Sequence, residues 1–299
     1  MRTTSVLINN YNNGRYIAAC VDSVLAQSVQ ADEVIVYDDG STDESLAILR
    51  GYGDQIMLIE GVHDSAQPSR VNQAAAVYHA FERSSGDWLF LLDGDDLFAP
   101  NKIERVLLAL SQGAGEGVAL VQSPLSLIDE HGSLIGRYRD RRFHHSNLQV
   151  AIYEQNDVDF FYPTSAMVVS RAALSMVLPL DMTVCPELSC DTRIGMLMPL
   201  LGGVLMIDES LASWRRHSGS YIAALGQSRW FQAQQTIRRV RTFNAAAPGF
   251  AAAKISLWGN QRFGRQLLGA LLPDGLRRRW RKNAATGLDP LQPAQTLQA

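Results

Sequence analysis

The sequence is poor in cysteine and has no long apolar run. Its 299 residues include three cysteines, Cys20, Cys185 and Cys190, with no spacing typical of a zinc site or a disulfide framework. We therefore expect reduced thiols and a cytoplasmic location. No stretch of 18 or more residues is uniformly apolar, so no membrane-spanning helix is predicted. The chain shows no basic leader followed by an apolar segment, and we expect no signal peptide.

Charge is unevenly distributed along a chain of ordinary globular composition. Apolar residues make up 46% and charged residues 19% of the sequence, and the net charge is −3. Residues 227–299 contain twelve lysines and arginines against two aspartates, so this region carries +10 and residues 1–226 carry −13. We expect one domain over 1–226, followed by a basic, mostly helical region over 227–299. The stretch 287–299 lacks periodicity and is expected to be disordered.

Three apolar segments of strand length alternate with helical patterns in the first hundred residues, and each ends in a polar cluster. The segments cover 5–8, 34–37 and 88–92. This alternation predicts an α/β fold with a mainly parallel, Rossmann-like sheet flanked by helices. In sheets of this kind, ligands bind beyond the carboxyl ends of the strands. The three polar clusters are therefore expected to form one site.

The cluster after the third segment is Asp93-Gly94-Asp95-Asp96. In extended backbone, Asp93 and Asp95 would point to one side, and Gly94 would let the chain turn and a ligand approach. Carboxylates held together in this way suit Mg²⁺ or Mn²⁺, which also binds substrate phosphates. Two roles stay open for Asp96, assistance at the metal and capping of the next helix.

The order of the clusters resembles the family 2 glycosyltransferases with the GT-A fold. That family begins with an apolar strand and a polar turn, continues with D-D-G-S-T-D, and later has G-D/E-x-x-x-x-L-D-x-D-D. The corresponding stretches here are 9–14, 38–43 and 86–96. The resemblance covers about residues 3–220. It implies a GT-A fold for this part of the chain, and the mostly helical region 227–299 would form a C-terminal helical extension.

The resemblance also implies roles for single residues. Asp95 is similar to the family's main metal ligand, and Asp93 to the residue that shares the metal and reaches the ribose. Asp38 and Asp39 resemble the pair that receives the nucleotide base. The implied donor-binding residues are Asn10, Tyr11, Asp38, Asp39, Arg70, Asp93 and Gly94, and the implied metal ligands are Asp95, Asp93 and His217.

Two elements of the second half complete the resemblance. Residues 186–193 resemble the family's acidic helix start, which makes Asp191 the implied general base on the acceptor hydroxyl. Cys190 stands where the family usually has another acid, and Glu187 is a second candidate for the base. Residues 214–217 resemble the family's Y-R-x-H element, and their last residue is His217.

The implied activity is a metal-dependent inverting transfer of one sugar from a nucleotide-sugar donor, with a UDP-sugar favoured. The acceptor would be a hydroxyl of a glycan in cell-surface polysaccharide synthesis. Two alternatives remain, a sugar-1-phosphate nucleotidyltransferase and a catalytically inactive glycan-binding GT-A module. The first class normally carries a glycine-rich loop where this chain has residues 9–14, and the second is disfavoured by the retained acids. Nothing in the sequence indicates a nucleic-acid partner.

The segment 263–282 combines leucines and aromatic residues with a cluster of arginines. This composition suits two short helices lying on an anionic membrane surface, on the inner face of the cell membrane. A lipid-linked glycan would then be the acceptor. The alternative is that these helices pack on the transferase domain or form a homodimer contact. The basic segment 137–147 is interpreted either as a solvated loop or as a lid over acceptor or phosphate.

Overall fold

The computed structural model describes residues 2–114, 117–138, 148–217, 229–257, 259–260 and 263. Most of the basic segment 137–147 lies outside the described residues. The same holds for the predicted membrane-binding segment, apart from Phe263, and for the tail 287–299.

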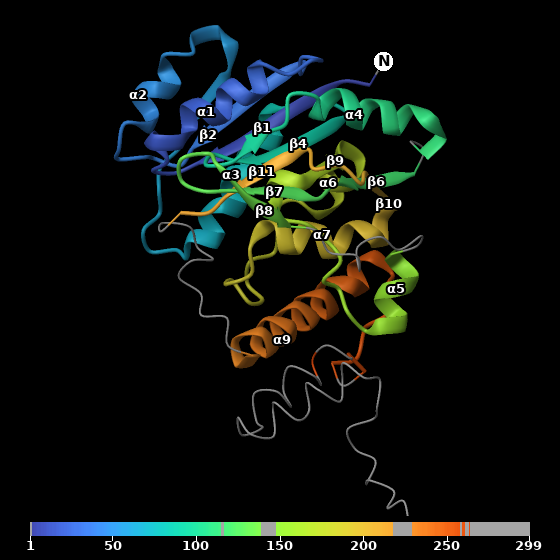
Figure 1. The fold of residues 1–299 in the computed structure, drawn as a ribbon. Helices are drawn as coiled ribbons and strands as arrows, with labels where there is room; N and C mark the ends of the chain where they lie inside the picture. The colour runs from blue at the N-terminus through green and yellow to red at the C-terminus, as the bar shows by residue number, and fades with distance from the viewer. Residues whose placement is uncertain are drawn as a thin grey trace, which may run out of the picture.

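A seven-stranded sheet forms the centre of the molecule (Figure 1). The strand order is β10-β6-β9-β4-β1-β2-β3. Strand β1 pairs in parallel with both β2 and β4, whereas β9 runs antiparallel to its neighbours β4 and β6. The predicted α/β fold with a mainly parallel sheet is therefore confirmed. The strands are β1 (Thr4–Asn10), β2 (Glu33–Asp38), β3 (Met57–Glu60), β4 (Trp88–Asp93), β6 (Val118–Gln122), β9 (Met167–Ser170) and β10 (Gly203–Met206).

Helices cover both faces of this sheet, which explains the continuous apolar runs of its inner strands. Residues 89–92 of β4 are at most 1% exposed. On one face lie α1 (Gly14–Leu25), α2 (Ser45–Arg50) and α4 (Lys102–Ala109) (Figure 1). On the other lie α3 (Ser69–Arg83), α6 (Arg171–Val177) and α7 (Cys190–Leu201). Helix α1 buries Ile17, Val21 and Val24, an apolar stripe at helical spacing.

A second, four-stranded sheet was not predicted from the sequence. Its order is β5-β11-β7-β8, with β5 (Leu97–Phe98), β7 (Leu125–Ile128), β8 (Leu134–Tyr138) and β11 (Ala212–Arg215). Strand β11 pairs with β5 in antiparallel and with β7 in parallel orientation. Because β5 directly follows the acidic cluster, this pairing brings residues 212–217 beside it.

The described part of the C-terminal region packs on the rest of the molecule. Helix α9 (Arg229–Ala246) contacts α7, as does α5 (Leu148–Gln155) (Figure 1). Within α9, Val240 and Phe243 are at most 4% exposed and belong to the same hydrophobic core as β1 and β4. The short helical turns are η1 (Gly53–Gln55), η2 (Leu110–Ala114), η4 (Thr164–Ala166) and η5 (Ala247–Phe250). Among the described residues, no helix has the length and apolarity needed to cross a membrane.

Candidate active site

A cavity of about 880 Å³ lies beyond the carboxyl ends of β1, β2 and β4. This volume is within the usual range for small-molecule sites. Its N-terminal wall, as we call the lining residues up to Asp95, comes from strand ends and from α3. Its C-terminal wall, the lining residues from Leu127 onward, comes from the second sheet, α7, α9 and the loops between them.

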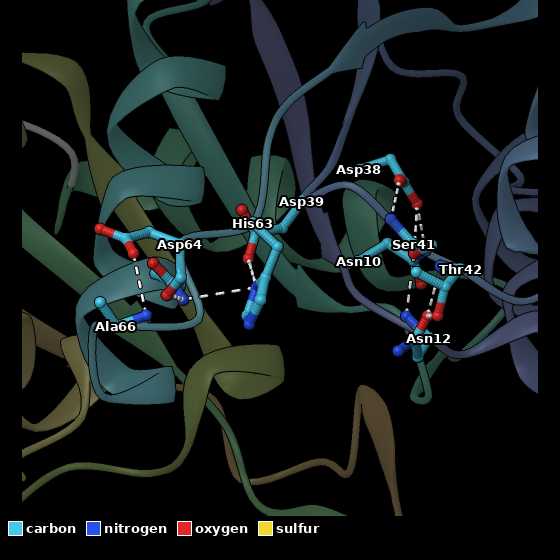
Figure 2. Close-up of polar contacts among 10 residues, drawn as sticks. Asn10, Asn12, Asp38, Asp39, Ser41, Thr42, His63, Asp64 and Ala66 are labelled. Atoms are coloured by element: carbon cyan, nitrogen blue, oxygen red, sulfur yellow. Dashed lines mark hydrogen bonds and ion pairs between the residues drawn. The ribbon is translucent and has the colours of Figure 1, made fainter.

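Nine of the ten predicted site residues line this cavity. They are Asn10, Tyr11, Asp39, Arg70, Asp93, Gly94, Asp95, Asp191 and His217. The tenth, Asp38, is fully buried. Its carboxylate accepts hydrogen bonds from Asn10 Nδ2 at 2.7 Å and from Ser41 N at 2.8 Å. Figure 2 shows Asn10 and Ser41 beside Asp38. The carboxylate of Asp38 therefore contacts the loop beside the cavity.

Asp93 ends β4 and is held by amides from two other elements. Its Oδ1 accepts from Asn9 Nδ2 at 3.0 Å and from Gln73 Nε2 at 3.1 Å. Burial raises the pKa of Asp93 to about 7, and the neighbouring charges of Asp95 and Asp191 add to this. Burial and the neighbouring carboxylates both disfavour the charged form of Asp93, and a bound cation would stabilise it.

Asp95 lies in a turn, so the predicted extended backbone across Asp93 and Asp95 is wrong. Both carboxylates nevertheless line the cavity, because Gly94 allows the chain to turn against β1. A Cβ at Gly94 would lie 2.6 Å from Asn10 Oδ1 and 3.1 Å from Asn9 O. Asp95 Oδ2 lies 2.9 Å from His217 Nε2, across 122 positions of sequence.

Arg215 holds this turn in place, a role that the sequence did not reveal. Its backbone N–H donates to Asp96 Oδ1 at 2.8 Å, and its Nε donates to Asp95 O at 2.7 Å. The guanidinium also lies over the ring of Tyr16, 4.8 Å from its centroid. Successive side chains of a strand point to opposite sides. Trp214 and Arg216, the residue just after β11, therefore line the cavity, while Arg215 between them contacts the turn from behind.

Asp96 is buried and is absent from the cavity lining. It accepts from Ser165 Oγ at 2.5 Å, and burial raises its pKa well above the usual range. Helix α4 has Asn101 as its N-cap, so the capping interpretation of Asp96 is wrong. Lys102 Nζ donates to Ser165 O at 2.6 Å, and burial lowers the pKa of Lys102 to about 7.

Asp191 lies in the first turn of α7, where the helix dipole favours a carboxylate. Its Oδ1 accepts from Thr192 N at 2.6 Å and from the Ser189 hydroxyl. No hydrogen bond to Oδ2 is found among the described residues. Glu187 also lines the cavity, but it is half exposed and lies 3.9 Å from Arg238 of α9.

Sequence reasoning missed two groups of lining residues. His63, in the loop between β3 and α3, contacts Asp39 and Tyr11. A single histidine in a loop carries no sequence signal. Helix α9 contributes Gln232, Gln235 and Arg239, whose spacing of three and four residues places them on one helix face. That polar stripe, which lies beside the buried apolar stripe of α9, is the sequence signal that could have identified these residues.

The donor set at the acidic turn suits a divalent cation only in part. Within the described ranges, no group of three or more histidines, cysteines or acids is arranged to hold a metal ion. Asp95 and His217 nevertheless bring an oxygen and a nitrogen ligand atom together, with Asp93 on the same cavity. Mg²⁺ and Mn²⁺ are commonly held by one or two carboxylates together with substrate phosphates, and this set fits that pattern.

Comparison with known proteins gives matches in both sequence and structure. The model of glycosyl transferase family 2 matches residues 5–174. An uncharacterized glycosyltransferase of Nostoc sp. is 29% identical over 220 residues, which are 72% of this chain and 65% of the relative. The glycosyltransferase GlyG of Streptococcus pneumoniae is 33% identical over 102 residues, 34% of this chain and 33% of the relative. The chain thus spans less than two thirds of the length of these relatives.

Two solved structures share the fold. TarS of S. aureus, crystallised with UDP-GlcNAc, superposes with a TM-score of 0.60 at 15% identity, over 94% of this chain and 79% of the TarS chain. The mannosyltransferase PcManGT of Pyrobaculum calidifontis, in complex with GDP-Man and Mn²⁺, gives 0.58 at 16% identity, over 97% and 81%.

Proposed function

The chain belongs to glycosyl transferase family 2 and has the GT-A fold, and we propose that it is a metal-dependent inverting glycosyltransferase. It moves one sugar from a nucleotide-sugar donor, with a UDP-sugar favoured, to a hydroxyl of a glycan. The observation that carries this proposal is the meeting of Asp95, His217 and Asp191 on one cavity. A metal-binding turn and a candidate base thereby face the same substrates.

The N-terminal wall is assigned to the donor. Tyr11 provides a partly exposed ring for the base, and Asp39 provides a carboxylate oxygen for its N–H. Arg70, on α3, is assigned to the diphosphate. Asp38 acts indirectly, because its hydrogen bonds to Asn10 and Ser41 hold the loop that carries Asp39. The similar folds of TarS, which binds UDP-GlcNAc, and PcManGT, which binds GDP-Man, support a nucleotide-sugar donor.

Asp95, Asp93 and His217 are assigned to a Mg²⁺ or Mn²⁺ ion. When bound, such an ion offsets the charge that develops on the leaving diphosphate. The structure of PcManGT is a complex with GDP-Man and Mn²⁺, which supports this choice. Other residues of the chain hold these metal ligands in position. Arg215 fixes the backbone of the turn, and Asn9 and Gln73 fix the carboxylate of Asp93.

Asp191 is assigned as the general base. Its Oδ1 is held by Ser189 and Thr192, so the carboxylate is oriented before substrate arrives. The oxygen of the acceptor hydroxyl attacks the anomeric carbon while its proton moves to Asp191 Oδ2 and the bond from that carbon to the nucleoside diphosphate breaks. Because the attack comes opposite the leaving diphosphate, the configuration is inverted.

The C-terminal wall is assigned to the acceptor, and α9, which follows the domain predicted over 1–226, therefore adds residues to the transferase site. Trp214 and Phe231 offer aromatic surface, and Gln232 and Gln235 offer amides for sugar hydroxyls. We place the reaction in cell-surface polysaccharide synthesis. The enzyme would work in the cytoplasm, with a lipid-linked glycan reached through residues 263–282.

A panel of nucleotide sugars, scored by released nucleotide with Mn²⁺ present and absent, tests the proposal. We expect one donor to be turned over only with metal, and Asp191→Asn to retain nucleotide binding. Release of pyrophosphate from a nucleoside triphosphate and a sugar 1-phosphate would instead identify a nucleotidyltransferase.

A further inference from the structure

The ring of Tyr16 lies beside the residues that surround the acidic turn, although it is not part of the cavity lining. Tyr16 belongs to the first turn of α1 and is 8% exposed. Its ring centroid lies 4.9 Å from that of His217, with the two planes 49° apart. The same centroid lies 4.8 Å from Cζ of Arg215. One buried ring therefore contacts both side chains that reach the acidic turn from the end of β11.

These two contacts lead to the assigned metal ligands by different routes. His217 is itself one of these ligands, and its Nε2 lies 2.9 Å from Asp95 Oδ2. Arg215 Nε donates to Asp95 O at 2.7 Å, so this contact fixes the backbone of the other ligand. A pair of aromatic rings and a cation over a ring are both favourable, and both depend on geometry. An aliphatic side chain of similar size would fill the space without orienting either neighbour.

The start of α1, which carries Tyr16, is held firmly against the rest of the molecule. Gly14 N donates to Asp43 Oδ2 at 2.8 Å, and a Cβ at Gly14 would lie 2.6 Å from Glu44 Cδ. This close approach packs the helix start against the loop after β2. Ile17, the next residue along the helix, is fully buried in the core. The ring of Tyr16 is therefore presented by a rigid element, as a side chain that orients other groups requires.

We propose that Tyr16 is a positioning residue of the metal site, which holds His217 and the backbone of Asp95 in the arrangement that binds the cation. This inference rests on the proposed function, because it requires that Asp95 and His217 hold Mg²⁺ or Mn²⁺. Tyr16 acts through these residues and touches no substrate, since it is absent from the cavity lining. Residues that orient metal ligands typically contribute about 10–100-fold to metal affinity. Loss of the ring should therefore weaken metal binding although every ligand atom is retained.

Calorimetric titration of the full chain with Mn²⁺, at a saturating concentration of UDP, tests this role without measuring activity. Tyr16→Leu keeps an apolar side chain in the buried position but removes the ring. We expect its Kd for Mn²⁺ to rise by about tenfold or more relative to the wild type. Tyr16→Phe keeps the ring and removes only the hydroxyl group, so its Kd for Mn²⁺ should stay close to that of the wild type.

Phe81→Leu is the matched control, because it removes a ring from a similar contact away from the cavity. Phe81 lies on α3 and outside the cavity lining, with its ring centroid 4.9 Å from Cζ of Arg171. Its Kd for Mn²⁺ should equal that of the wild type. A second comparison places Tyr16→Leu in a His217→Ala background. If Tyr16 acts through His217, the two losses should not add, and Tyr16→Leu should weaken Mn²⁺ binding by a smaller factor there than in the wild type.

An unchanged Kd for Mn²⁺ in a folded Tyr16→Leu variant overturns the inference and leaves the proposed function standing. The inference also fails if Phe81→Leu loses as much affinity, or if Tyr16→Leu has the same effect with and without His217. Tyr16→Met is made in parallel, because its flexible side chain adapts to the space left by the ring, and it replaces Tyr16→Leu if that variant does not fold. A wild-type chain that binds no Mn²⁺ defeats both this inference and the metal dependence of the proposed function.

Discussion

The two walls of the cavity are built in different ways. The N-terminal wall consists of short polar clusters that directly follow the strands β1, β2 and β4, together with the loop and helix after β3. The C-terminal wall gathers residues from β7, β8, β11, α7 and α9, which are far apart in the chain. The first wall is therefore fixed mainly by local sequence, and the second by tertiary packing. Substitutions in the two walls should affect different substrates.

The largest effect is expected for Asp191→Asn. The substitution keeps the shape of the side chain but removes the proton acceptor, so transfer should fall by about 10²–10⁴-fold while the Kd for UDP is unchanged. Rates of sugar transfer and calorimetric Kd values measure the two quantities. Asp181→Asn is a matched control, because Asp181 is exposed and accepts from Thr183 outside the cavity.

A loss of UDP binding in Asp191→Asn, with transfer preserved, would contradict the assignment of the second wall to the acceptor. Glu187 would then become the candidate for the base. The stereochemistry of the product gives an independent check, since retention of the anomeric configuration is incompatible with a single displacement assisted by Asp191.

A smaller loss of about 10²-fold in rate is expected for Asp95→Asn, because one charge-stabilising group at the leaving diphosphate is weakened. This residue lies where the walls meet, in contact with His217. Turnover measured as a function of Mn²⁺ concentration should show that the variant needs more Mn²⁺ for half-maximal turnover. Asp54→Asn, in the short turn η1, serves as the control for loss of a surface charge. Full activity of the wild type in excess chelator would refute a metal role.

The difference between the walls also explains what the sequence could predict. The order of βα elements and the acidic turn were predictable, because apolar runs and short-range periodicity determine them. The second sheet was not, because β5 has two residues and pairs with β11 far along the chain. The burial of Asp38 and the contact of His63 with Asp39 depend on how two loops meet. No local sequence pattern indicates that the two loops contact each other.

A third prediction compares the walls directly. Tyr11→Ala should weaken UDP binding by about tenfold, since stacking of a base on an aromatic ring is worth about 1–3 kcal/mol, and should leave the acceptor KM unchanged. Arg216→Gln should do the reverse and raise the acceptor KM several-fold, because its guanidinium lines the cavity over Trp214. Arg241→Gln, on an exposed position of α9, should change neither constant. The walls would not be separable if both variants weakened UDP equally.

The smallest effect is expected in the stability of the ligand-free chain. It tests whether a residue of one wall influences the protonation of a residue in the other. The folded-state pKa of Asp93 is about 7, whereas the unfolded value is about 3.9. Between these values the folded state binds more protons, so the Asp93 contribution to the free energy of unfolding falls as pH rises from about 4 to 7. Urea titrations at several pH values give the free energy of unfolding, whose slope against pH should be smaller in Asp93→Asn than in the wild type over this window.

Asp191 lies in the other wall and contributes to the raised pKa of Asp93, so Asp191→Asn should reduce this slope in part. A wild-type slope in Asp93→Asn would contradict the raised pKa of Asp93. A wild-type slope in Asp191→Asn alone would show that the two walls titrate independently.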